Sequence, residues 1–476
     1  MTAYRKKILQ YIDNRSIGIL GCSTEGIATA KFLLKEKIPF AMLDQKYKAE
    51  LGGEYEKFKR LGVTFHLGND YLAHMDRYQL LFRTPGMPLW LPHLYDAKKK
   101  GCEITSHIKL FFSLAPFPII GVSGTKGKGT TATLIGTILT KAGLSAPVGG
   151  NIGTPPLDFL LARKTPAYAV LELSSFQLED LSQSPQVAVV LMITQEHLDS
   201  ASSANPNYHK NLAAYHKAKA HIVKFQKKND LAIFNADYPV SLNLSNQTPA
   251  QTYFFSTKKQ VRGAYLVEYS ASSRQDIIIS LGKKKEKLSH METALLPGRH
   301  NRENMMAAAV TARLLGVHPR VIGRELLSFR GLPNRLEKIK EIRGVSYIND
   351  SFSSTPETTI AAIQAYRQPI VLIAGGSEKG SNYSYLGRAI GNSTVKCVIL
   401  IGDMAKKIRN AITSGGTYKG NILLGPNTME NMVALAQKQV QEGDIVLLSP
   451  GCASFDLFKN YKERGELFRN AVDALS

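Results

Sequence analysis

The chain has 476 residues, of which 44% are hydrophobic and 21% charged, and its formal net charge is +22. This length corresponds to roughly two to four domains, and the composition is that of a globular protein rather than a disordered one. No apolar run approaches the roughly 18 residues that a membrane-spanning helix needs, which argues against an integral membrane protein.

The excess of basic residues raises the question of a nucleic-acid partner. The lysines are scattered, and their densest run, Lys283 to Lys287, falls between two strand-like segments where a hairpin would turn. We therefore expect a basic surface that attracts small polyanions and binds no nucleic acid. The four cysteines are far apart and the N-terminus lacks a signal peptide, so we expect a cytoplasmic protein without disulfides.

The first predicted unit is a Rossmann-like domain over residues 1–106. A strand is expected at 16–22, a helix at 27–34 and a second strand at 40–43. In the turn after the first strand, Ser23 stands where a dinucleotide-binding fingerprint has a glycine, which argues against NAD and an oxidoreductase. The backbone N–H groups of this turn could still bind a diphosphate. The alternative is an α/β unit without a ligand.

The second predicted unit, 107–330, begins with the most informative stretch, residues 117–133 (FPIIGVSGTKGKGTTAT). An apolar, strand-like run is followed by glycines and lysines, and a helical pattern starts at Thr130. This is the layout of a phosphate-binding loop, in which backbone N–H groups, a helix N-terminus and a lysine, here Lys128, face the anion. Because Gly129 follows the lysine, a magnesium-binding hydroxyl would come from Thr130 or Thr131. The alternative is a flexible surface turn.

Two further buried strands of this unit each precede a potential metal ligand. Glu172 ends the strand expected at 169–173, and His197 follows the strand expected at 187–193. The carboxyl ends of parallel strands meet at one edge of a sheet, so these side chains should converge with Lys128. A carboxylate and an imidazole beside a phosphate loop suit a divalent cation. Taken singly, Glu172 could instead form a salt bridge and His197 could cap a helix.

The rest of the chain alternates between helix and strand patterns. Residues 208–228 predict a basic helix, 250–290 an antiparallel appendage and 305–315 an alanine-rich helix. A third unit is expected over 331–476, with strands at 345–348, 370–374, 397–401, 422–424 and 445–449 and a helix at 356–366. The predicted fold class is α/β in three domains: a Rossmann-like N-terminal domain, a central parallel sheet like that of P-loop ATPases with an antiparallel appendage, and a Rossmann-like C-terminal domain.

These motifs, taken in order, resemble the Mur ligases over nearly the whole chain. The resemblance is carried by GTKGKGTT at 124–131, GGNIG at 149–153, LELSSFQLE at 171–179, EHLD at 196–199, AYHKAKAHIV at 214–223, LPGRHNREN at 296–304, GLPNRLE at 331–337, NDS at 349–351, AGG at 374–376 and LLSPGCASFDLFKNYKERGELF at 447–468. It implies a monomeric, ATP-dependent ligase that joins D-glutamate to UDP-N-acetylmuramoyl-L-alanine through an acyl phosphate.

The resemblance also implies which residues hold the nucleotide and the metal. The ATP phosphates would lie on Gly124, Thr125, Lys126, Gly127, Lys128, Gly129 and Thr130, and the rest of ATP near Asn301, Asn304, Arg335 and Asp350. Two magnesium ions would be held by Thr130, Glu172, His197 and Lys219, the last as a carbamylated lysine. The catalytic set would be Lys128, Asn151, His197 and Lys219, with Asn151 near the substrate carboxyl group.

The two other substrates are assigned to the outer units by the same resemblance. The UDP moiety would contact Ser23, Thr24 and Asp44, and the substrate would also meet Ser174 and Gln177. Glutamate would contact Ser354, Lys379, Ser454, Phe455 and Tyr461, where Lys379 supplies the cation that an acidic amino acid needs. A helix cap is the alternative for Ser454.

Two positions depart from the pattern of the glutamate-adding branch. Gly129 stands where that branch has a hydroxyl residue and resembles folylpolyglutamate synthases instead, and Phe352 stands where most members have lysine. The sequence around Phe352 resembles a related branch that adds L-glutamate. We therefore keep L-glutamate, or a folate substrate, as alternatives, beside a non-catalytic protein that binds nucleotides or nucleic acid.

Overall fold

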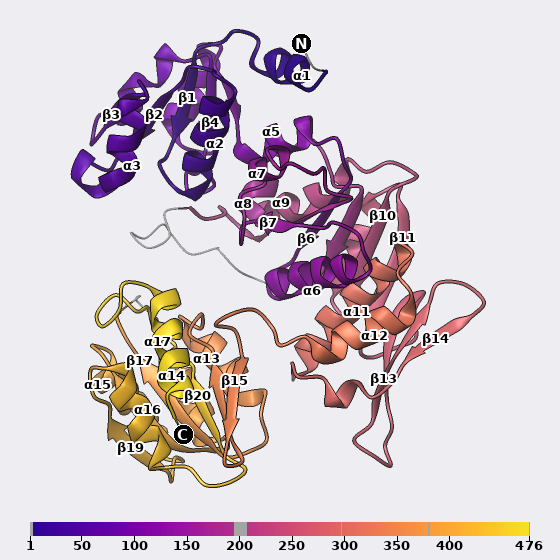
Figure 1. The fold of residues 1–476 in the computed structure, drawn as a ribbon, viewed down its shortest axis with the longest axis vertical. Coiled ribbons are helices and arrows are strands. Elements are labelled where there is room, and N and C mark those ends of the chain that lie inside the picture. Colours follow the sequence, from indigo (N-terminus) through magenta and orange to yellow (C-terminus); the bar gives the residue numbers. More distant parts are fainter. Residues whose placement is uncertain (1–2, 195–206, 297, 379–380, 476) are drawn as a thin grey trace. The chain divides into compact units, whose positions relative to one another are not determined.

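The structure, a computed structural model, describes residues 3–194, 207–296, 298–378 and 381–475. The chain divides into two compact units, Met1–Ser289 with Glu303–Glu325, and His290–Arg302 with Leu326–Ser476. Sheets of five, nine and six strands build these units, which confirms the α/β class (Figure 1). The three domain boundaries stay a prediction. Within the described ranges, no helix is both long and apolar enough to span a bilayer.

The first sheet is parallel, with strand order β3-β2-β1-β4-β5. Its strands are β1 Ile17–Leu20, β2 Ala41–Asp44, β3 Thr64–Leu67, β4 Leu80–Arg83 and β5 Glu103–Thr105, and its helices are α1 Ala3–Ile12, α2 Thr24–Lys35, α3 Lys48–Arg60 and α4 Pro92–Lys99. After β1 the chain crosses to β2 and β3 on one side of the sheet, and after β4 it crosses to β5 on the other side. The carboxyl ends of β1 and β4 therefore flank the switch point at which such sheets bind ligands.

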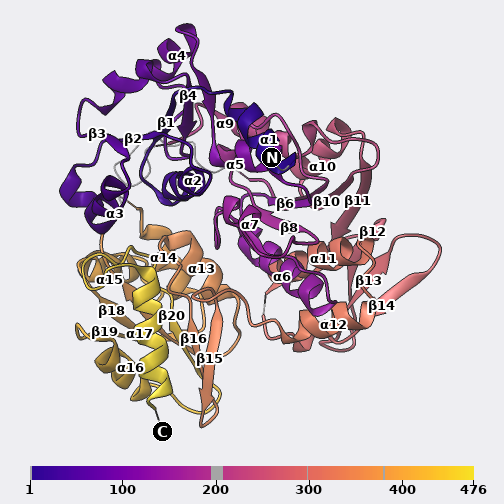
Figure 2. The same cartoon turned by 45° about the horizontal axis from the view of Figure 1, so that its top comes forward.

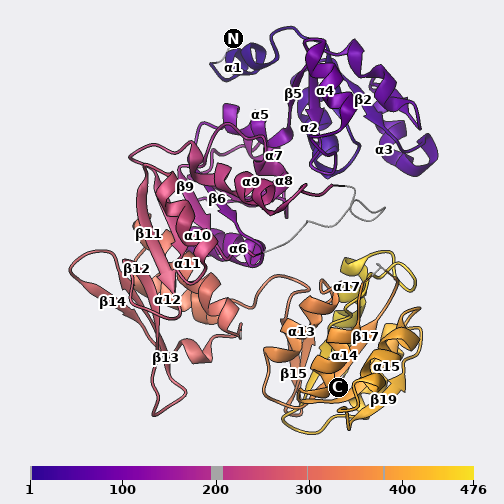
Figure 3. The same cartoon turned by 180° about the vertical axis from the view of Figure 1, so that it is seen from behind.

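The second sheet has the order β14-β13-β12-β11-β10-β9-β6-β8-β7. Its elements are α5 His107–Leu114, β6 Ile119–Ser123, α6 Lys128–Lys141, β7 Val148–Gly150, α7 Leu157–Leu160, β8 Ala169–Glu172, α8 Ser175–Leu178, β9 Val187–Val190, α9 Leu212–Lys224, β10 Leu231–Asn235, α10 Pro239–Leu244, β11 Gln251–Ser256, β12 Gly263–Glu268, β13 Gln275–Ser280, β14 Lys285–Leu288, α11 Arg299–Leu314 and α12 Pro319–Ser328. Helix α6 connects β6 to β7 and helix α9 connects β9 to β10, so the two connections run in opposite directions across the sheet. Because such crossovers are right-handed, α6 and α9 lie on opposite faces of this sheet (Figures 1 and 3).

The antiparallel appendage is smaller than predicted. Strand β11 pairs parallel with both β10 and β12, and only β12, β13 and β14 pair antiparallel. The prediction for 250–290 is thus wrong at β11. Helix α10 provides the crossover that the parallel pairing of β10 with β11 requires. The lysine run starts in the β13–β14 turn and continues into β14. Helix α11 also begins at Arg299, earlier than the predicted 305.

The third sheet has the order β15-β16-β20-β17-β18-β19, and only β15 is antiparallel to its neighbour. Its elements are β15 Glu337–Ile342, β16 Val345–Asn349, α13 Pro356–Gln364, β17 Ile370–Gly375, α14 Ser384–Gly391, β18 Val395–Ile401, α15 Ala405–Ser414, β19 Asn421–Leu424, α16 Met429–Gln437, β20 Ile445–Leu448 and α17 Tyr461–Asp473. Helices α13 to α15 cover one face and α16 with α17 the other (Figures 2 and 3). The predicted strands are confirmed. The charged edge strand β15 was not predicted.

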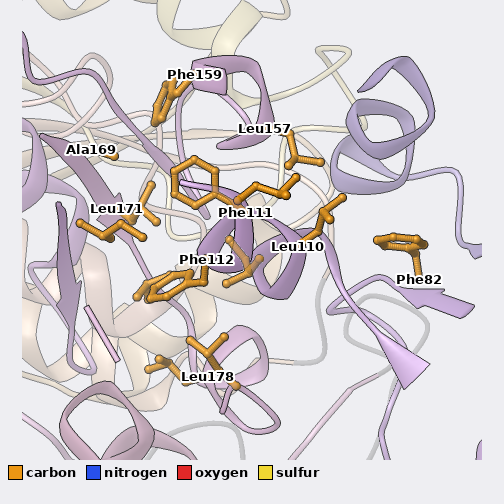
Figure 4. Packing of buried hydrophobic residues seen from close by; sticks show 14 of the residues in the cluster. Phe82, Leu110, Phe111, Phe112, Leu157, Phe159, Ala169, Leu171 and Leu178 are labelled. Atoms are coloured by element: carbon orange, nitrogen blue, oxygen red, sulfur yellow. The ribbon is translucent and has the colours of Figure 1, made fainter. Parts of the chain in front are cut away.

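A continuous core connects the first two sheets inside the first unit. Phe82 of β4, Leu110 and Phe111 of α5, Leu171 of β8 and Leu178 of α8 belong to one cluster, and each is at most 2% exposed (Figure 4). Burying such a side chain stabilises the fold by about 1.5–3 kcal/mol. The loop after β4 and the segment after β8 are therefore mounted on one packed core.

Candidate active site

The predicted phosphate loop connects β6 to α6. Gly127 has a φ of 87°, a conformation that favours glycine, and it packs closely against the side chain of Asn304. Helix α6 begins at Lys128, directly after the loop. The strand, loop and helix N-terminus thus form the arrangement that binds phosphate groups in other proteins.

The loop is held in place by hydrogen bonds, unlike the flexible turn that was its alternative. Thr125 is 4% exposed, its N–H donates to the carbonyl of Met192 at 2.7 Å, and its Oγ1 accepts from the N–H of Thr194 at 2.9 Å. The Nζ of Lys128 donates to the carbonyls of Gly124 at 3.1 Å and Thr125 at 2.9 Å. The loop is therefore tied to the segment after β9, with the lysine ammonium folded over it and Lys126 exposed.

The structure distinguishes the two threonines that follow the loop. The hydroxyl of Thr131 is fully buried and donates to Oδ1 of Asn304 at 3.2 Å, so it packs α11 against α6. Thr130 is 8% exposed. Thr130 is thus the better candidate for a magnesium ligand. Asn301 and Asn304, both in α11, are 3% and 5% exposed.

Glu172 lies at the carboxyl end of β8, beside the strand that leads into the loop. It pairs with Val122 of β6 and is 3% exposed. Its Oε1 accepts a hydrogen bond from Nδ2 of Asn151 at 3.0 Å, while Oε2 is buried with no hydrogen-bond partner in the described parts of the chain. No described lysine or arginine forms the salt bridge that was the alternative for Glu172. An unpaired buried carboxylate oxygen is costly and is a ligand type that magnesium prefers.

Lys219 approaches the same loop from α9. Its Nζ donates to Oγ of Ser123 at 3.2 Å and to the carbonyl of Gly124 at 2.8 Å, and the residue is 2% exposed. Lys217 and Lys224 of the same helix are exposed, as predicted for most lysines of this segment. The structure thus brings Lys128, Thr130, Glu172, Asn151 and Lys219 to one edge of the central sheet.

Two predicted site residues, His197 and Lys379, lie outside the described residues. Among those that are described, no group of three or more histidine, cysteine, aspartate or glutamate side chains is assembled for a metal ion. Among the described residues, the donors that fit magnesium here include the carboxylate of Glu172 and the hydroxyl of Thr130 near the loop.

In the first sheet, the predicted UDP contacts gather at the turn after β1. Ser23 and Thr24 begin α2. The carboxylate of Asp44, which is 8% exposed, accepts from the N–H groups of Cys22 at 2.5 Å and Lys46 at 2.8 Å. Asp44 therefore stabilises this turn, and its contact with a ribose or base stays a prediction.

Ser174 and Gln177 form a capping box at the start of α8. The Oγ of Ser174 accepts from the N–H of Gln177, and Oε1 of Gln177 accepts from the N–H of Ser174. The Nε2 of Gln177 donates to Oε1 of Glu25 in α2, a link that sequence reasoning missed. Burial raises the pKa of Glu25 to about 7, although Gln177 and Arg83 lower it.

In the second unit, Asp350 organises the end of β16. Its carboxylate accepts from the N–H of Leu336 at 3.2 Å, from Ser353 Oγ at 2.5 Å and from Ser449 Oγ at 2.7 Å. Burial raises the pKa of Asp350 to about 6. Asp350, a predicted ATP contact, thus links the end of β16 to the loop that follows β20 within this unit.

Phe352, the unusual residue of the NDS segment, connects two predicted site residues. The guanidinium of Arg335 lies 3.7 Å from the centroid of the Phe352 ring, and this ring packs edge-on against Tyr461 with centroids 5.0 Å apart.

The predicted glutamate contacts differ in exposure. Ser354 is half-buried and Ser454 is 2% exposed, whereas Phe455 is 72% exposed. Phe455 is thus the most accessible of the described residues predicted to contact glutamate.

Arg464 was missed by sequence reasoning, although it lies in the KERG string. It is fully buried and donates to the carbonyls of Ser351 at 2.9 Å, Cys452 at 3.3 Å and Ala453 at 3.2 Å. Burial lowers the pKa of its guanidinium to about 10. Arg464 therefore fixes the two loops that carry the predicted ribose and glutamate contacts.

Comparisons with known proteins agree with this architecture. Models of the Mur ligase middle domain and of the Mur ligase glutamate ligase domain match residues 122–312 and 334–452. UDP-N-acetylmuramoylalanine--D-glutamate ligases of Acetivibrio thermocellus and Symbiobacterium thermophilum are 34% and 36% identical, over 99% and 96% of this chain and 98% of each relative.

Solved structures give the same fold at lower identity. The UDP-N-acetylmuramate-alanine ligase MurC of Thermotoga maritima has a TM-score of 0.61 at 18% identity, covering 97% of this chain and 100% of that one. MurF of Acinetobacter baumannii has a TM-score of 0.58 at 17% identity, covering 86% and 82%. These likenesses establish the fold of the chain.

Proposed function

The chain belongs to the Mur ligase family, and from this membership we propose that it joins D-glutamate to UDP-N-acetylmuramoyl-L-alanine at the expense of ATP, in the synthesis of peptidoglycan precursors. The observation that carries this proposal is full-length similarity to ligases named for that reaction. The phosphate loop with Glu172 and Lys219 beside it supports the location of the chemistry.

The reaction needs activation because an amine does not displace oxide from a carboxylate. In the first step, an oxygen of the alanyl carboxylate bonds to the γ-phosphorus of ATP, the bond from that phosphorus to the bridging oxygen breaks, and ADP leaves. In the second step, the glutamate amine bonds to the acyl carbon, the acyl–oxygen bond breaks, and inorganic phosphate leaves. The amine gives up its protons to water or phosphate.

The chain's own residues supply positioning and charge. The phosphate loop, Lys128 and the N-terminus of α6 bind the transferred phosphoryl group and offset its negative charge, and Asn151 orients the carboxyl group. Thr130, Glu172, His197 and Lys219 would hold magnesium, which neutralises phosphate charge when bound. Carbamylation of Lys219 would replace its ammonium by an acidic group of the kind that a second magnesium ion prefers.

The remaining assignments belong to the same proposal. Asn301, Asn304, Arg335 and Asp350 contact the adenosine part and phosphates of ATP, and Ser23, Thr24, Asp44, Ser174 and Gln177 contact the nucleotide-sugar. Ser354, Lys379, Ser454, Phe455 and Tyr461 contact glutamate. Arg335, a proposed ATP contact, and Tyr461, a proposed glutamate contact, both pack on Phe352. This supports neighbouring contacts for the nucleotide and the amino acid in the second unit.

A single set of assays tests the reaction and its alternatives. The protein is incubated with ATP, magnesium and UDP-N-acetylmuramoyl-L-alanine plus either D- or L-glutamate, and in parallel with a folate and L-glutamate. ADP release and product mass are measured. We expect a product with D-glutamate alone. A product with L-glutamate alone would revise the stereochemistry, and turnover of the folate alone would replace the proposed substrate. Absence of ADP release in every mixture would reject the proposal.

A further inference from the structure

Arg83, the last residue of β4, is among the most deeply buried cations of the described chain. The residue is 2% exposed, although arginine is almost never buried unless it is paired. One terminal nitrogen, Nη1, donates to the carbonyl of Met87 at 2.6 Å, and the other, Nη2, donates to the carbonyl of Phe176 at 3.0 Å. A single guanidinium thus bridges the loop after β4 to helix α8 of the central sheet.

Acidic side chains compensate the charge of Arg83. Its guanidinium lies 3.4 Å from Glu179 and 3.5 Å from Asp180, and Lys109 pairs with Asp180 at 3.0 Å. Burial raises the pKa of Glu179 to about 7, with Arg83 acting in the opposite direction. The acidic residues directly follow α8, so the ion pairs reinforce the bridge made by the carbonyl hydrogen bonds.

A second set of contacts also holds this loop. We call residues Thr84 to Pro88 the TPGMP turn. The Nδ2 of Asn207 donates to the carbonyl of Pro85 at 2.7 Å, and the next residue, Tyr208, packs on the ring of Trp90 with centroids 5.1 Å apart. The TPGMP turn is therefore held at Pro85 by Asn207 of the central part of the chain, and at Met87 by Arg83, which also bonds α8.

The segment that contains Asn207 is itself fixed to α8. The ring of His209 stacks on Phe176 with centroids 4.7 Å apart, and its Nε2 lies 2.9 Å from Oγ of Ser175. The TPGMP turn also contacts the turn after β1, where a Cβ on Gly21 would clash with the side chain of Thr84. The TPGMP turn thus lies between the ligand-binding switch point of the first sheet and the segment that follows Glu172.

From this geometry we infer that Arg83 is a positioning residue for the nucleotide-sugar: it sets the TPGMP turn against α8, so that a substrate bound at the first sheet presents its carboxyl group in a fixed register to Glu172 and the phosphate loop. The identity of the substrate in this inference rests on the proposed function. Arg83 itself does not contact the reacting atoms. Its effect passes through the main-chain carbonyls of Met87 and Phe176.

The test compares Arg83→Met and Arg83→Lys with the wild-type full-length protein. Arg83→Met keeps a long side chain but loses both donors, and Arg83→Lys keeps the charge but cannot bridge two carbonyls with fixed geometry. Binding of UDP-N-acetylmuramoyl-L-alanine is measured by calorimetry without ATP, and KM is measured for all three substrates. We expect Arg83→Met to raise Kd and KM for the nucleotide-sugar about tenfold or more, with KM for ATP and glutamate changed less than about twofold. Arg83→Lys should fall between.

Arg464→Met is the matched control, because Arg464 is an equally buried arginine that bonds main-chain carbonyls, but in the second unit. It should lower stability and leave the Kd for the nucleotide-sugar unchanged. If Arg83→Met binds the nucleotide-sugar like the wild type, or weakens all three substrates equally, the positioning role is wrong. If Arg83→Met does not fold, Asn207→Ala, which frees the same turn at Pro85, should raise the same KM. An unchanged KM in that variant would also refute the inference.

Hydrogen exchange separates this inference from the proposed function. Without any substrate, residues 84–88 should exchange faster in Arg83→Met than in the wild type, because the turn loses its anchor at Met87. Unchanged exchange would overturn the bridge even if the enzyme ligates glutamate. Faster exchange in a protein whose wild type binds no UDP-N-acetylmuramoyl-L-alanine would uphold the bridge and reject the substrate.

Discussion

The Nζ of Lys219 lies 2.8 Å from the carbonyl oxygen of Gly124, so a lysine of α9 is in direct contact with the first residue of the phosphate loop. Burying an ammonium group is costly unless it is well paired, and the exposed lysines of the same helix incur no such cost. A lysine buried at this position is therefore expected to serve the chemistry of the loop rather than the solubility of the helix.

Replacing Lys219 by alanine should abolish most of the ligase activity. We expect a loss on the order of 100-fold in kcat, because both the cation beside the loop and the proposed carbamate ligand disappear. High bicarbonate, the source of carbon dioxide for carbamylation, should not restore activity. Lys217→Ala, on the exposed side of α9, is the control and should retain normal activity. Full activity in Lys219→Ala would remove its role in metal binding.

Replacing Glu172 by glutamine should change the magnesium requirement. Glutamine keeps the shape and an acceptor for Asn151, but a neutral amide is a weaker ligand for a hard cation. The magnesium concentration for half-maximal ADP release should rise about 10- to 100-fold. Stability should not fall, since Oε2 of Glu172 is buried without a partner and its charge is removed. An unchanged magnesium dependence would contradict the assignment of Glu172.

The sequence was sufficient for the features that depend on local pattern. The phosphate loop and the buried strand ending in Glu172 follow from short-range periodicity and glycine spacing, whereas Lys219 was expected from the family resemblance. The structure brings all three together. Parallel topology then explains why these separate segments meet, since strand ends share one edge of a sheet.

The features that sequence reasoning missed depend on contacts between distant segments. Arg83 and Phe176 are 93 positions apart, and Arg464 and Ser351 are 113 apart, so no local pattern marks either pair. The parallel pairing of β11 was missed for a related reason. An alternating strand has the same sequence pattern whether its neighbour runs parallel or antiparallel. For β10 and β11, the crossover through α10 makes the pairing parallel.

Phe352 offers a test of the second unit. Its ring supports the guanidinium of Arg335 at 3.7 Å, and such cation–π contacts contribute roughly 0.5–2 kcal/mol. Phe352→Leu keeps an apolar side chain but removes the aromatic face. If Arg335 contacts ATP as proposed, KM for ATP should rise about 2- to 30-fold, as this energy range implies, while the Kd of the nucleotide-sugar stays unchanged. A variant with wild-type KM for ATP would show that the stack does not position Arg335 for the nucleotide.

The buried carboxyl group of Glu25 should make the first unit less stable as pH rises. Burial raises its pKa from 4.5 to about 7 in the folded protein, so between these values the folded state keeps a proton that the unfolded state has lost. The free energy of unfolding therefore falls as pH rises from about 4.5 to 7, and Glu179, with a pKa also raised to about 7 by burial, acts in the same sense.

Glu25→Gln removes the contribution of Glu25 to this pH dependence. Between pH 5.5 and pH 8, the variant should gain about 2 kcal/mol relative to the wild type, because about 1.5 pKa units lie between pH 5.5 and the raised pKa. Urea unfolding can be followed by the fluorescence of Trp90, the single tryptophan of the chain, which lies in the first unit. Glu56→Gln, exposed on α3, should parallel the wild type. Parallel curves for Glu25→Gln and the wild type would show that Glu25 is ionised in the folded protein throughout this range, and that its link to Gln177 joins a carboxylate rather than a carboxylic acid to the central sheet.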